Sequence, residues 1–445
     1  MRHRTTRREF LRNMTAVSAV TPLFLAARAK AQPGPNERLN VAFIGVGGIG
    51  GSHRGAIHGM GENGVVLCDA DLDQANAGKE QFPNATIYTD YRRMFDAEAN
   101  NIDAVMVGTP DHHHYPASII AMQLGKHVYT QKPLTRTVWE ARQLAVAAAA
   151  NPKLATQMGN QGHAGVHWRR IYEIVNHGVL GDITEIHTWT NRPVWPQGMD
   201  RPQGEDPIPA NLDWEAWIGS APMRPFKEGA YHPFVWRGWW DFGAGALGDM
   251  ACHTMDGTFW SLDPGHPTSV EPLQVNGATS EAFPNTSVTR WNFPARNGRP
   301  GFQQYWYDGG LFPEKPADMP ADQNLPGTGN LYIGTNGTMV IPGDYGENPS
   351  IYKEGEVVEP GELPELLPRS PGHFEEWVAA CKGQPGIGPQ SNFTYAGPMT
   401  ETILLGCVAQ RVNQPLEWDG ENMRFTNLDE ANAFLGGDFR EGWAF

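Results

Sequence analysis

The chain has 445 residues, of which 40% are hydrophobic, so it is long enough for two or three domains with ordinary buried cores. Its formal net charge of −15 at pH 7 argues against nucleic acids and anionic membranes as partners, because both attract basic surfaces. The four cysteines show no metal-binding spacing, and we expect buried free thiols at Cys68, Cys252, Cys381 and Cys407.

The first 31 residues have the features of a twin-arginine export signal. Thr-Arg-Arg-Glu-Phe-Leu begins at Thr6, a mildly apolar stretch covers 14–27, and small residues at 29 and 31 suit a signal peptidase. The apolar stretch is short for a bilayer span, although an uncleaved anchor is the alternative. We expect export to the periplasm through residues 1–31, a linker at 32–38, and no other membrane attachment.

Short apolar runs alternate with helical patterns between residues 39 and 153. The expected strands are 39–44, 65–68, 102–108 and 127–130, and the expected helices start near 52 and cover 72–81, 115–124 and 137–150. Such alternation produces a parallel sheet with helices on both faces. With right-handed crossovers it predicts an α/β, doubly wound Rossmann domain over residues 39–153.

The pattern changes in residues 154–445, where Gly and Pro interrupt the chain and helical patterns thin out. Alternating segments predict strands at 183–190, 288–293 and 339–341, and helices return near 374–382 and 398–411. We expect a second domain with a mixed or antiparallel sheet and long loops.

Gly45, Gly47 and Gly50 form a G-x-G-x-x-G pattern between the first strand and the following helix. These glycines permit a tight turn and a close approach of a pyrophosphate, which the free N–H groups of the helix N-terminus then bind. Gly48 and Ile49 lie in the same turn and are expected to contact the dinucleotide. The alternative is a glycine-rich turn in an ordinary α/β domain.

Asp69 ends the second strand, where a carboxylate can accept hydrogen bonds from the adenosine ribose. Because an acid at this position repels a 2′-phosphate, NAD is favoured over NADP. Asp71 and Asp73 are nearby alternatives for this role.

Three more motifs indicate a family. Thr-Pro-Asp-His-His-His begins at Thr109, Gln-Lys-Pro begins at Gln131, and a glycine-rich stretch from Gly243 leads to Asp249 and His253. With the glycine motif, they resemble the Gfo/Idh/MocA family of glucose–fructose oxidoreductase and inositol dehydrogenase over most of the mature chain. The resemblance implies a Rossmann domain and an α/β domain with a large, open, mostly antiparallel sheet, which carries the substrate site and often builds homo-oligomers.

The resemblance places Lys132 at the end of a strand, beside the nicotinamide, where it can share a proton with a substrate hydroxyl or hold that hydroxyl by hydrogen bonding. Gln131 stands where the family usually has Glu, which leaves the orientation of Lys132 open. The alternative for Lys-Pro is a surface turn.

Asp249 and His253 are four residues apart and would share one helix face. They match the family's catalytic pair, in which the imidazole takes the hydroxyl proton as hydride leaves the carbon. Asp249 would bind a neighbouring hydroxyl or orient the site, and Asp256 would orient His253 or contact the substrate.

The family also places Thr109, Pro110 and His114 near the nicotinamide ribose. His112, His113 and His114 suggest a metal site at first, but consecutive residues point in different directions and make a poor chelate, so we expect no metal.

Further substrate contacts are expected from residues near the cleft in the second domain: Gln161, His163, Arg192, Trp195, Arg237 and Trp240. Tryptophans can stack on sugar rings and arginines can bind hydroxyls. For any single tryptophan, core packing is the alternative.

These motifs predict hydride transfer between NAD and a hydroxyl carbon of a sugar or sugar derivative. An exported enzyme would meet no free nicotinamide pool, so we expect a tightly held cofactor that a second substrate recycles. The alternative is an NAD-dependent glycoside hydrolase or lyase, which oxidises transiently, eliminates and returns the hydride. The sequence does not separate the two, because both need Lys132, His253 and NAD. A non-catalytic binding protein on the same fold is a third hypothesis, against which the intact catalytic residues argue.

Overall fold

The computed structural model describes residues 38–386 and 388–443. The predicted export signal at 1–31, and all but the last residue of the predicted linker at 32–38, lie outside these residues. Within them, no helix is both long enough and apolar enough to cross a membrane. Three of the four cysteines are buried free thiols as predicted, and Cys381 is a half-buried free thiol.

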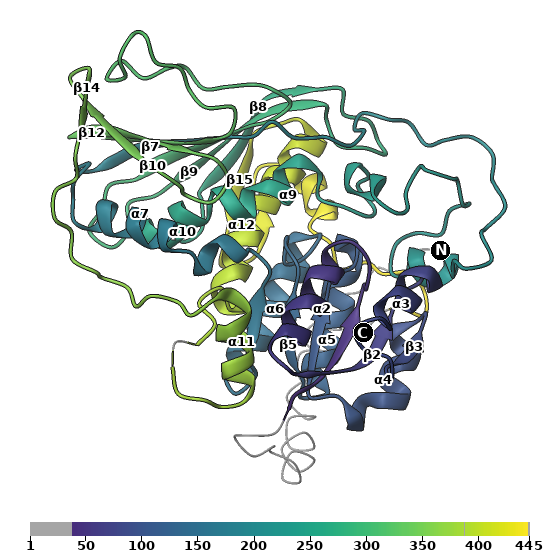
Figure 1. The fold of residues 1–445 in the computed structure, drawn as a ribbon. Coiled ribbons are helices and arrows are strands. Elements are labelled where there is room, and N and C mark those ends of the chain that lie inside the picture. The colour runs from purple at the N-terminus through teal and green to yellow at the C-terminus, as the bar shows by residue number, and fades with distance from the viewer. Residues whose placement is uncertain (1–37, 387, 444–445) are drawn as a thin grey trace.

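The first domain is a six-stranded parallel sheet in the order β3-β2-β1-β4-β5-β6, with helices on both faces (Figure 1). Its strands are β1 (Asn40–Ile44), β2 (Asn63–Cys68), β3 (Thr86–Tyr88), β4 (Ala104–Val107), β5 (His127–Thr130) and β6 (Thr156–Met158). Its helices are α2 (Ile49–Gly59), α3 (Leu72–Gly78), α4 (Tyr91–Glu98), α5 (His114–Gln123) and α6 (Val138–Ala150). The predicted Rossmann domain is therefore confirmed.

The predicted domain boundary after residue 153 is too early. β6 pairs in parallel with β5, with Val128 opposite Thr156 and Thr130 opposite Met158, so the sheet continues to Met158. The three-residue strand is too short to leave a periodic pattern in the sequence.

The second domain contains a ten-stranded sheet in the order β14-β13-β12-β11-β7-β10-β9-β8-β15-β16. Among the described strands of this sheet, only β7 and β10 pair in parallel, so the sheet is mostly antiparallel, as expected. Its strands are β7 (Ile183–Trp189), β8 (Ser269–Asn276), β9 (Thr286–Phe293), β10 (Phe302–Tyr307), β11 (Gly329–Gly334), β12 (Gly337–Pro342), β13 (Ser350–Lys353), β14 (Glu356–Val358), β15 (Leu416–Asp419) and β16 (Arg424–Phe425).

The helices of the second domain are α7 (Val166–Asn176), α8 (Trp214–Ile218), α9 (Gly245–Thr254), α10 (Asp256–Leu262), α11 (His373–Cys381) and α12 (Phe393–Val412). Of these, α7, α9, α10 and α12 lie on the side of the large sheet that faces the first domain (Figure 1). Short 3₁₀ turns occur at 99–101, 111–113, 161–164, 235–238 and 429–434.

Helix α12 fixes the two domains to each other. Asn392 caps its first turn by accepting from the N–H groups of Thr394 and Tyr395. Gly397 allows a close approach to α6, because a Cβ there would lie 2.7 Å from the Cβ of Ala145. Arg142 of α6 makes two 2.6 Å contacts with Glu401, whose side chain is only 1% exposed. A buried carboxylate needs such a partner, so the pair specifies how the domains dock.

Candidate active site

A cleft of about 520 Å³ lies between the domains, at the carboxyl ends of the first sheet's strands. In doubly wound sheets this is where ligands bind, at the point where the strand order reverses between β1 and β4. The predicted residues that line it are Gly45, Gly47, Gly48, Ile49, Asp69, Thr109, Pro110, Gln131, Lys132, Arg237 and Asp249.

The glycine loop fits a dinucleotide. A Cβ at Gly45 would lie 2.5 Å from the carbonyl carbon of Gly108, and one at Gly50 would lie 2.1 Å from the oxygen of Gly45, so both must be glycine. Gly48 has φ of +51° and open space around it. It precedes α2 without a side-chain cap, which leaves the helix N-terminus available to a phosphate.

Asp69 occupies the predicted ribose position at the end of β2. Its Oδ2 accepts from the N–H groups of Val46 and Gly47 at 2.8 and 3.3 Å, and its Oδ1 accepts from Asp71. Burial raises its pKa, and these backbone hydrogen bonds oppose the rise. Asp73 and Asp71, the alternatives, instead bind the side-chain amide of Asn211.

Thr109 and Pro110 line the cleft as expected, and the buried hydroxyl of Thr109 has no hydrogen-bond partner within the described residues. Such an unpaired polar atom is suited to a polar group of a bound cofactor. His114, expected at the ribose, is fully buried and does not line the cleft. Its ring nitrogens lie 2.7 and 3.0 Å from the carbonyl oxygens of Pro133 and Thr109, so it supports the cleft wall from behind.

Lys132 and Asp249 meet across the domain boundary. Nζ of Lys132, at the end of β5, donates to Oδ1 and to the carbonyl oxygen of Asp249 on α9, at 3.0 and 2.8 Å. Arg237 donates from Nε to the same Oδ1 at 3.3 Å. The two cations lower the pKa of Asp249, although burial opposes this as the largest single effect. A lysine, an arginine and a shared carboxylate therefore converge in the cleft.

The glycine-rich stretch before Asp249 has a packing reason. A Cβ at Gly243 would lie 2.6 Å from the Cα of Arg237, and one at Gly248 would lie 2.2 Å from the Cβ of Ala244. Gly245 begins α9 with φ of +62°. These glycines bring the segment that carries Arg237 against the helix that carries Asp249.

His253 lies on α9 one turn after Asp249, as predicted. It is 5% exposed, and burial together with the charge of Lys132 lowers its pKa to about 3, whereas Asp249 acts in the opposite direction. Its Nδ1 has no hydrogen-bond partner within the described residues. The imidazole is thus neutral at ordinary pH and can accept a proton.

The predicted role of Asp256 beside His253 is wrong. The carboxylate of Asp256 lies 2.9 Å from Nδ1 of His163 and accepts from the hydroxyl of Tyr395 at 2.6 Å. His163, expected at the substrate, is 1% exposed and stacks on Trp260 with centroids 3.9 Å apart. Asp256 and His163 therefore form a buried network that does not line the cleft.

Gln131 does not orient Lys132. Its Oε1 accepts from Nε2 of His53 at 3.1 Å, and its Nε2 donates to the carbonyl oxygen of Gly159 at 3.3 Å. The substitution of Glu by Gln therefore leaves the lysine's partner, Asp249, in place. The neutral amide suits a buried neutral imidazole, since burial lowers the pKa of His53 to about 4.

The two tryptophans expected at the substrate lie in the core. Trp240 is 5% exposed, packs on Phe283 and donates to the carbonyl oxygen of Thr279. Trp195 is equally buried and lies beneath Arg237, with the guanidinium 5.7 Å from its ring centre. Gln161 and Arg192 are half-buried and do not line the cleft. Core packing, the alternative for these tryptophans, is the better description.

His112 and His113 do lie together, with ring centroids 4.1 Å apart. Both Nε2 atoms face the carbonyl oxygen of Trp217, at 3.0 and 2.8 Å. Within the described residues, no group of three or more His, Cys, Asp or Glu side chains has a metal-binding arrangement. The pair instead connects the first domain to the segment around Trp217.

Sequence reasoning missed several cleft residues. Asp111 is 3% exposed, and burial raises its pKa well above the usual range, against the influence of Arg237. Its position directly after Thr109 and Pro110, which were predicted to contact the cofactor, is the sequence feature that could have identified it. Trp217 and His232 line the cleft from the second domain, where no local pattern marks them.

A segment of the second domain covers the adenosine side of the cleft. Backbone hydrogen bonds join Leu72 to Asn211 and Asp213 to Ala70, both at 2.8 Å. The hydroxyl of Thr89 donates to the carboxylate of Asp213 at 2.9 Å. We call residues 211–219 the clasp; with Ala216 and Trp217 it forms part of the cleft wall.

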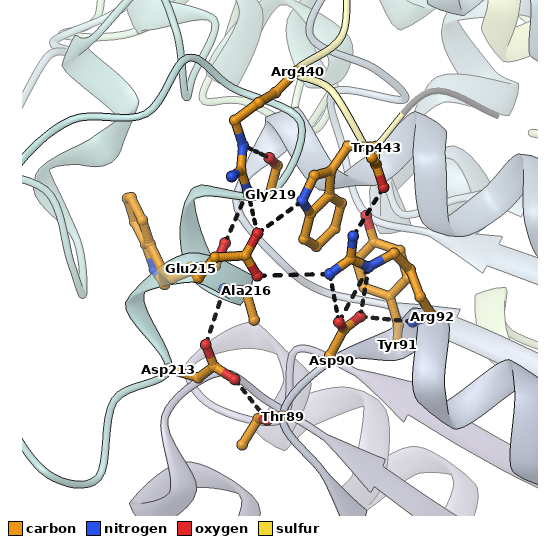
Figure 2. A network of polar contacts seen from close by, with 12 residues as sticks. Thr89, Asp90, Tyr91, Arg92, Asp213, Glu215, Ala216, Gly219, Arg440 and Trp443 are labelled. Carbon is orange, nitrogen blue, oxygen red and sulfur yellow. Dashed lines mark hydrogen bonds and ion pairs between the residues drawn. The ribbon is translucent and has the colours of Figure 1, made fainter.

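The chain's last described residues hold the clasp in place (Figure 2). Arg440 donates to the carbonyl oxygen of Gly219 and to Glu215, both at 2.8 Å, and Trp443 donates to Glu215 at 3.2 Å. Arg92, at the start of α4, lies over the Trp443 ring at 3.6 Å and also faces Glu215 at 3.6 Å. Three distant stretches of chain thus close over one end of the cofactor cleft.

Two sequence models of one protein family match the chain. The "Oxidoreductase family, NAD-binding Rossmann fold" model matches residues 39–159, and the "Oxidoreductase family, C-terminal alpha/beta domain" model matches residues 164–292. Together they cover more than half of the chain.

The chain spans about a third to a half of the length of the curated relatives that it matches. An "Alpha-N-acetylgalactosaminidase" of Shewanella oneidensis is 30% identical over 208 residues, which are 41% of this chain and 45% of that protein. An "Inositol 2-dehydrogenase" of Rhodococcus erythropolis is 28% identical over 168 residues, 37% of this chain and 48% of that protein. A "Glycosyl hydrolase family 109 protein 1" of a Shewanella species is 32% identical over 157 residues, 33% of this chain and 34% of that protein.

Solved structures share the fold at low identity. The WlbA dehydrogenase of Bordetella pertussis, in complex with NADH and UDP-GlcNAcA, has a TM-score of 0.59 and 17% identity, and the match covers 86% of this chain and all of that one. An aldose-aldose oxidoreductase of Caulobacter crescentus has a TM-score of 0.56 and 14% identity, with 86% and 100% coverage. At these identities the likeness establishes the arrangement of domains alone.

Removing the charge of Lys132 should raise the pKa of His253. In a Lys132→Met variant the imidazole loses its repulsive neighbour but keeps Asp249, so its pKa should move up from about 3 toward 6.5. An NMR titration, with His253 assigned through a His253→Gln variant, measures this.

Lys153→Met, which removes an exposed lysine, is the matched control and should leave the titration of His253 unchanged. An unchanged or lower pKa in Lys132→Met would contradict the proposed proximity. Because folding lowers the pKa of His253, the protein should be most stable with respect to this group above pH 6.5, where the imidazole is neutral in both states. This contribution to the free energy of unfolding is lost as the pH falls toward 3.

Proposed function

Because the chain belongs to the Gfo/Idh/MocA oxidoreductase family, we propose that it transfers hydride between tightly bound NAD and a hydroxyl carbon of a sugar or sugar derivative. The observation that carries the proposal is the contact of Lys132 with Asp249, one helix turn before His253, in a cleft that the glycine loop and Asp69 also line. This arrangement combines a dinucleotide site with a base that is neutral at ordinary pH.

In the oxidation direction, the chain's residues handle the proton of the alcohol. NAD, when bound, supplies the hydride acceptor. A ring nitrogen of His253 takes the hydroxyl proton as the C–H hydride leaves, so that a carbonyl forms and one proton remains on the enzyme. Lys132 donates a hydrogen bond to the reacting oxygen, and Asp249 holds the ammonium in position. In reduction the same groups return the proton.

The identity of the cofactor follows from Asp69. The half-buried carboxylate of Asp69 already accepts from Val46 and Gly47, and it has remaining acceptor capacity for ribose hydroxyls. A 2′-phosphate would place a second anion beside it, which supports NAD rather than NADP.

Transient oxidation followed by elimination is the second candidate. Two relatives have names that describe glycosidases, "Alpha-N-acetylgalactosaminidase" and "Glycosyl hydrolase family 109 protein 1", and they favour this reaction. Net oxidation and transient oxidation begin with the same removal of a hydride from the sugar. Free aglycone without net redox change would identify this reaction, whereas a ketone or lactone product would identify the oxidoreductase.

Export and self-association belong to the same proposal. The motif at 6–11 supports a twin-arginine signal that sends the loaded enzyme to the periplasm, and cell fractionation of an Arg7→Lys, Arg8→Lys variant tests it.

The surface proposed to form a homo-oligomer is one side of the ten-stranded sheet. It presents a ladder of half-buried polar and aromatic groups that includes His187, Tyr305 and Tyr307. Light scattering of the purified protein gives the molar mass.

The redox state of bound nicotinamide tests the function. Purified protein should contain nicotinamide that becomes reduced, as seen by absorbance and fluorescence, when one sugar or glycoside of a panel is added. A Lys132→Ala, His253→Ala double variant should keep the nicotinamide and lose this response by about 10²-fold or more.

No bound nicotinamide in the wild type, and none taken up on addition, would refute the proposal. Full activity or full phenotype in the double variant would favour the non-catalytic binding protein instead. An Arg424→Ala variant, which removes an exposed arginine at β16, is the control for general effects of substitution.

Loosening the clasp should release the cofactor. Arg440→Ala removes the hydrogen bonds to Gly219 and Glu215, and charged hydrogen bonds of this kind contribute about 1.5–3 kcal/mol. The dissociation rate of NAD, followed by exchange with labelled NAD, should rise about tenfold or more.

The Arg424→Ala variant again serves as the control and should release NAD at the wild-type rate. Equal release rates in the two variants would show that the clasp does not retain the cofactor.

A further inference from the structure

The loop between β12 and β13 forms a second wall at the catalytic helix. The ring of Tyr345 lies edge-on to His253, with centroids 5.2 Å apart and planes at 72°. The ring also packs on Gly162, where a Cβ would lie 2.6 Å from its Cδ1. Gly346 has φ of +81° and packs on Trp168, which fixes the loop behind the tyrosine. Tyr345 is nevertheless 41% exposed, so part of its ring is available to a ligand.

Asp344, next to Tyr345, has an unused acceptor. Its Oδ1 is buried and has no hydrogen-bond partner within the described residues, and the side chain of Thr328 is its one hydrogen-bonding neighbour. The carboxyl group is within electrostatic range of Lys132, Asp249 and Arg192. A buried carboxylate oxygen without a donor is costly unless a ligand provides one.

Two of the cations around this loop already share an acid. Lys132 and Arg237 share the carboxylate of Asp249, and the guanidinium of Arg237 also lies over the Trp236 ring at 4.2 Å. Arg192 binds Asn191 and lies in the field of Asp344. A substrate carboxylate or phosphate needs an unpaired cation, since a buried anion without one carries a large desolvation penalty.

We propose that Asp344 and Tyr345 bind the ring of an uncharged, polyhydroxylated substrate, whose hydroxyls donate to Asp344 and whose apolar face covers Tyr345. Uronates and phosphosugars should bind more weakly, because their anion would lie beside the carboxylate of Asp344, whereas Lys132 and Arg237 already share the carboxylate of Asp249. The inference rests on the proposed function and names the substrate class of the same site.

Calorimetry of the NAD-loaded protein with matched pairs of ligands tests this. The neutral probes are D-glucose, D-galactose, N-acetyl-D-galactosamine, myo-inositol and D-galacturonamide, and the anionic probes are D-glucuronate and D-galacturonate. At least one neutral ring should bind about tenfold or more tightly than the uronates, since a hydrogen bond to a charged group has that effect on affinity. D-Galacturonamide should bind more tightly than D-galacturonate, from which it differs only in charge and one polar group.

Variants separate the two side chains. Asp344→Asn should weaken the neutral ring about tenfold and narrow its advantage over the uronates. Tyr345→Ala should weaken it several-fold, whereas Tyr345→Phe should match the wild type because the ring face and not the hydroxyl is used. Asp318→Asn removes an acid that binds Thr338 near the opposite end of β12, and should change nothing. Unchanged cofactor content and melting temperature show that each variant is folded.

Uronates that bind as tightly as neutral rings, no binding by any neutral ring, or wild-type affinity in both Asp344→Asn and Tyr345→Ala would overturn the inference. The redox response of the bound nicotinamide is recorded separately. Neutral rings that bind through Asp344 without changing that redox state would refute the proposed function and leave this inference intact.

Discussion

The contact between Lys132 and Asp249 sets the geometry on which the site depends. Lys132 extends from the first domain and Asp249 from the second, so the catalytic groups meet only when the domains are docked. Both side chains are largely buried, at 15% and 13% exposed, and breaking such a pair by removing one partner costs about 3–5 kcal/mol. Arg142 and Glu401 repeat the arrangement between α6 and α12, so a second buried ion pair contributes to how the domains sit.

The same contact contributes to the proton chemistry. Burial and the positive charge of Lys132 keep the imidazole of His253 unprotonated, and the negative charge of Asp249 limits this effect. A base, a hydrogen-bond donor and a carboxylate thereby occupy adjacent positions without neutralising one another. Gln131, which differs from the family pattern, is hydrogen-bonded to His53 and Gly159 and takes no part in this balance.

The sequence predicted residues whose roles depend on local spacing. The glycine loop, Asp69, Lys132 and Asp249 lie at strand ends or on a helix and line one cleft. His253 lies one turn after Asp249 on the same helix, although it does not itself line the cleft. The predicted role of Asp256 was wrong because α9 ends at Thr254 and a new helix begins at Asp256. The helical spacing that would place Asp256 beside His253 is therefore interrupted. The clasp, Asp344 and Tyr345 depend on contacts between distant segments, as between Arg92, Glu215 and Arg440, and no local pattern encodes those.

The most direct test of this account is the rate at which a sugar reduces the bound nicotinamide of an Asp249→Asn variant, compared with the wild type. The account predicts that the variant keeps its cofactor, because Asp69 and the clasp are untouched, and that reduction slows by about 10²-fold or more as Lys132 loses its anchor and His253 its acidic neighbour. Reduction at the wild-type rate with full cofactor content would contradict the claim that the contact between Lys132 and Asp249 assembles the catalytic site.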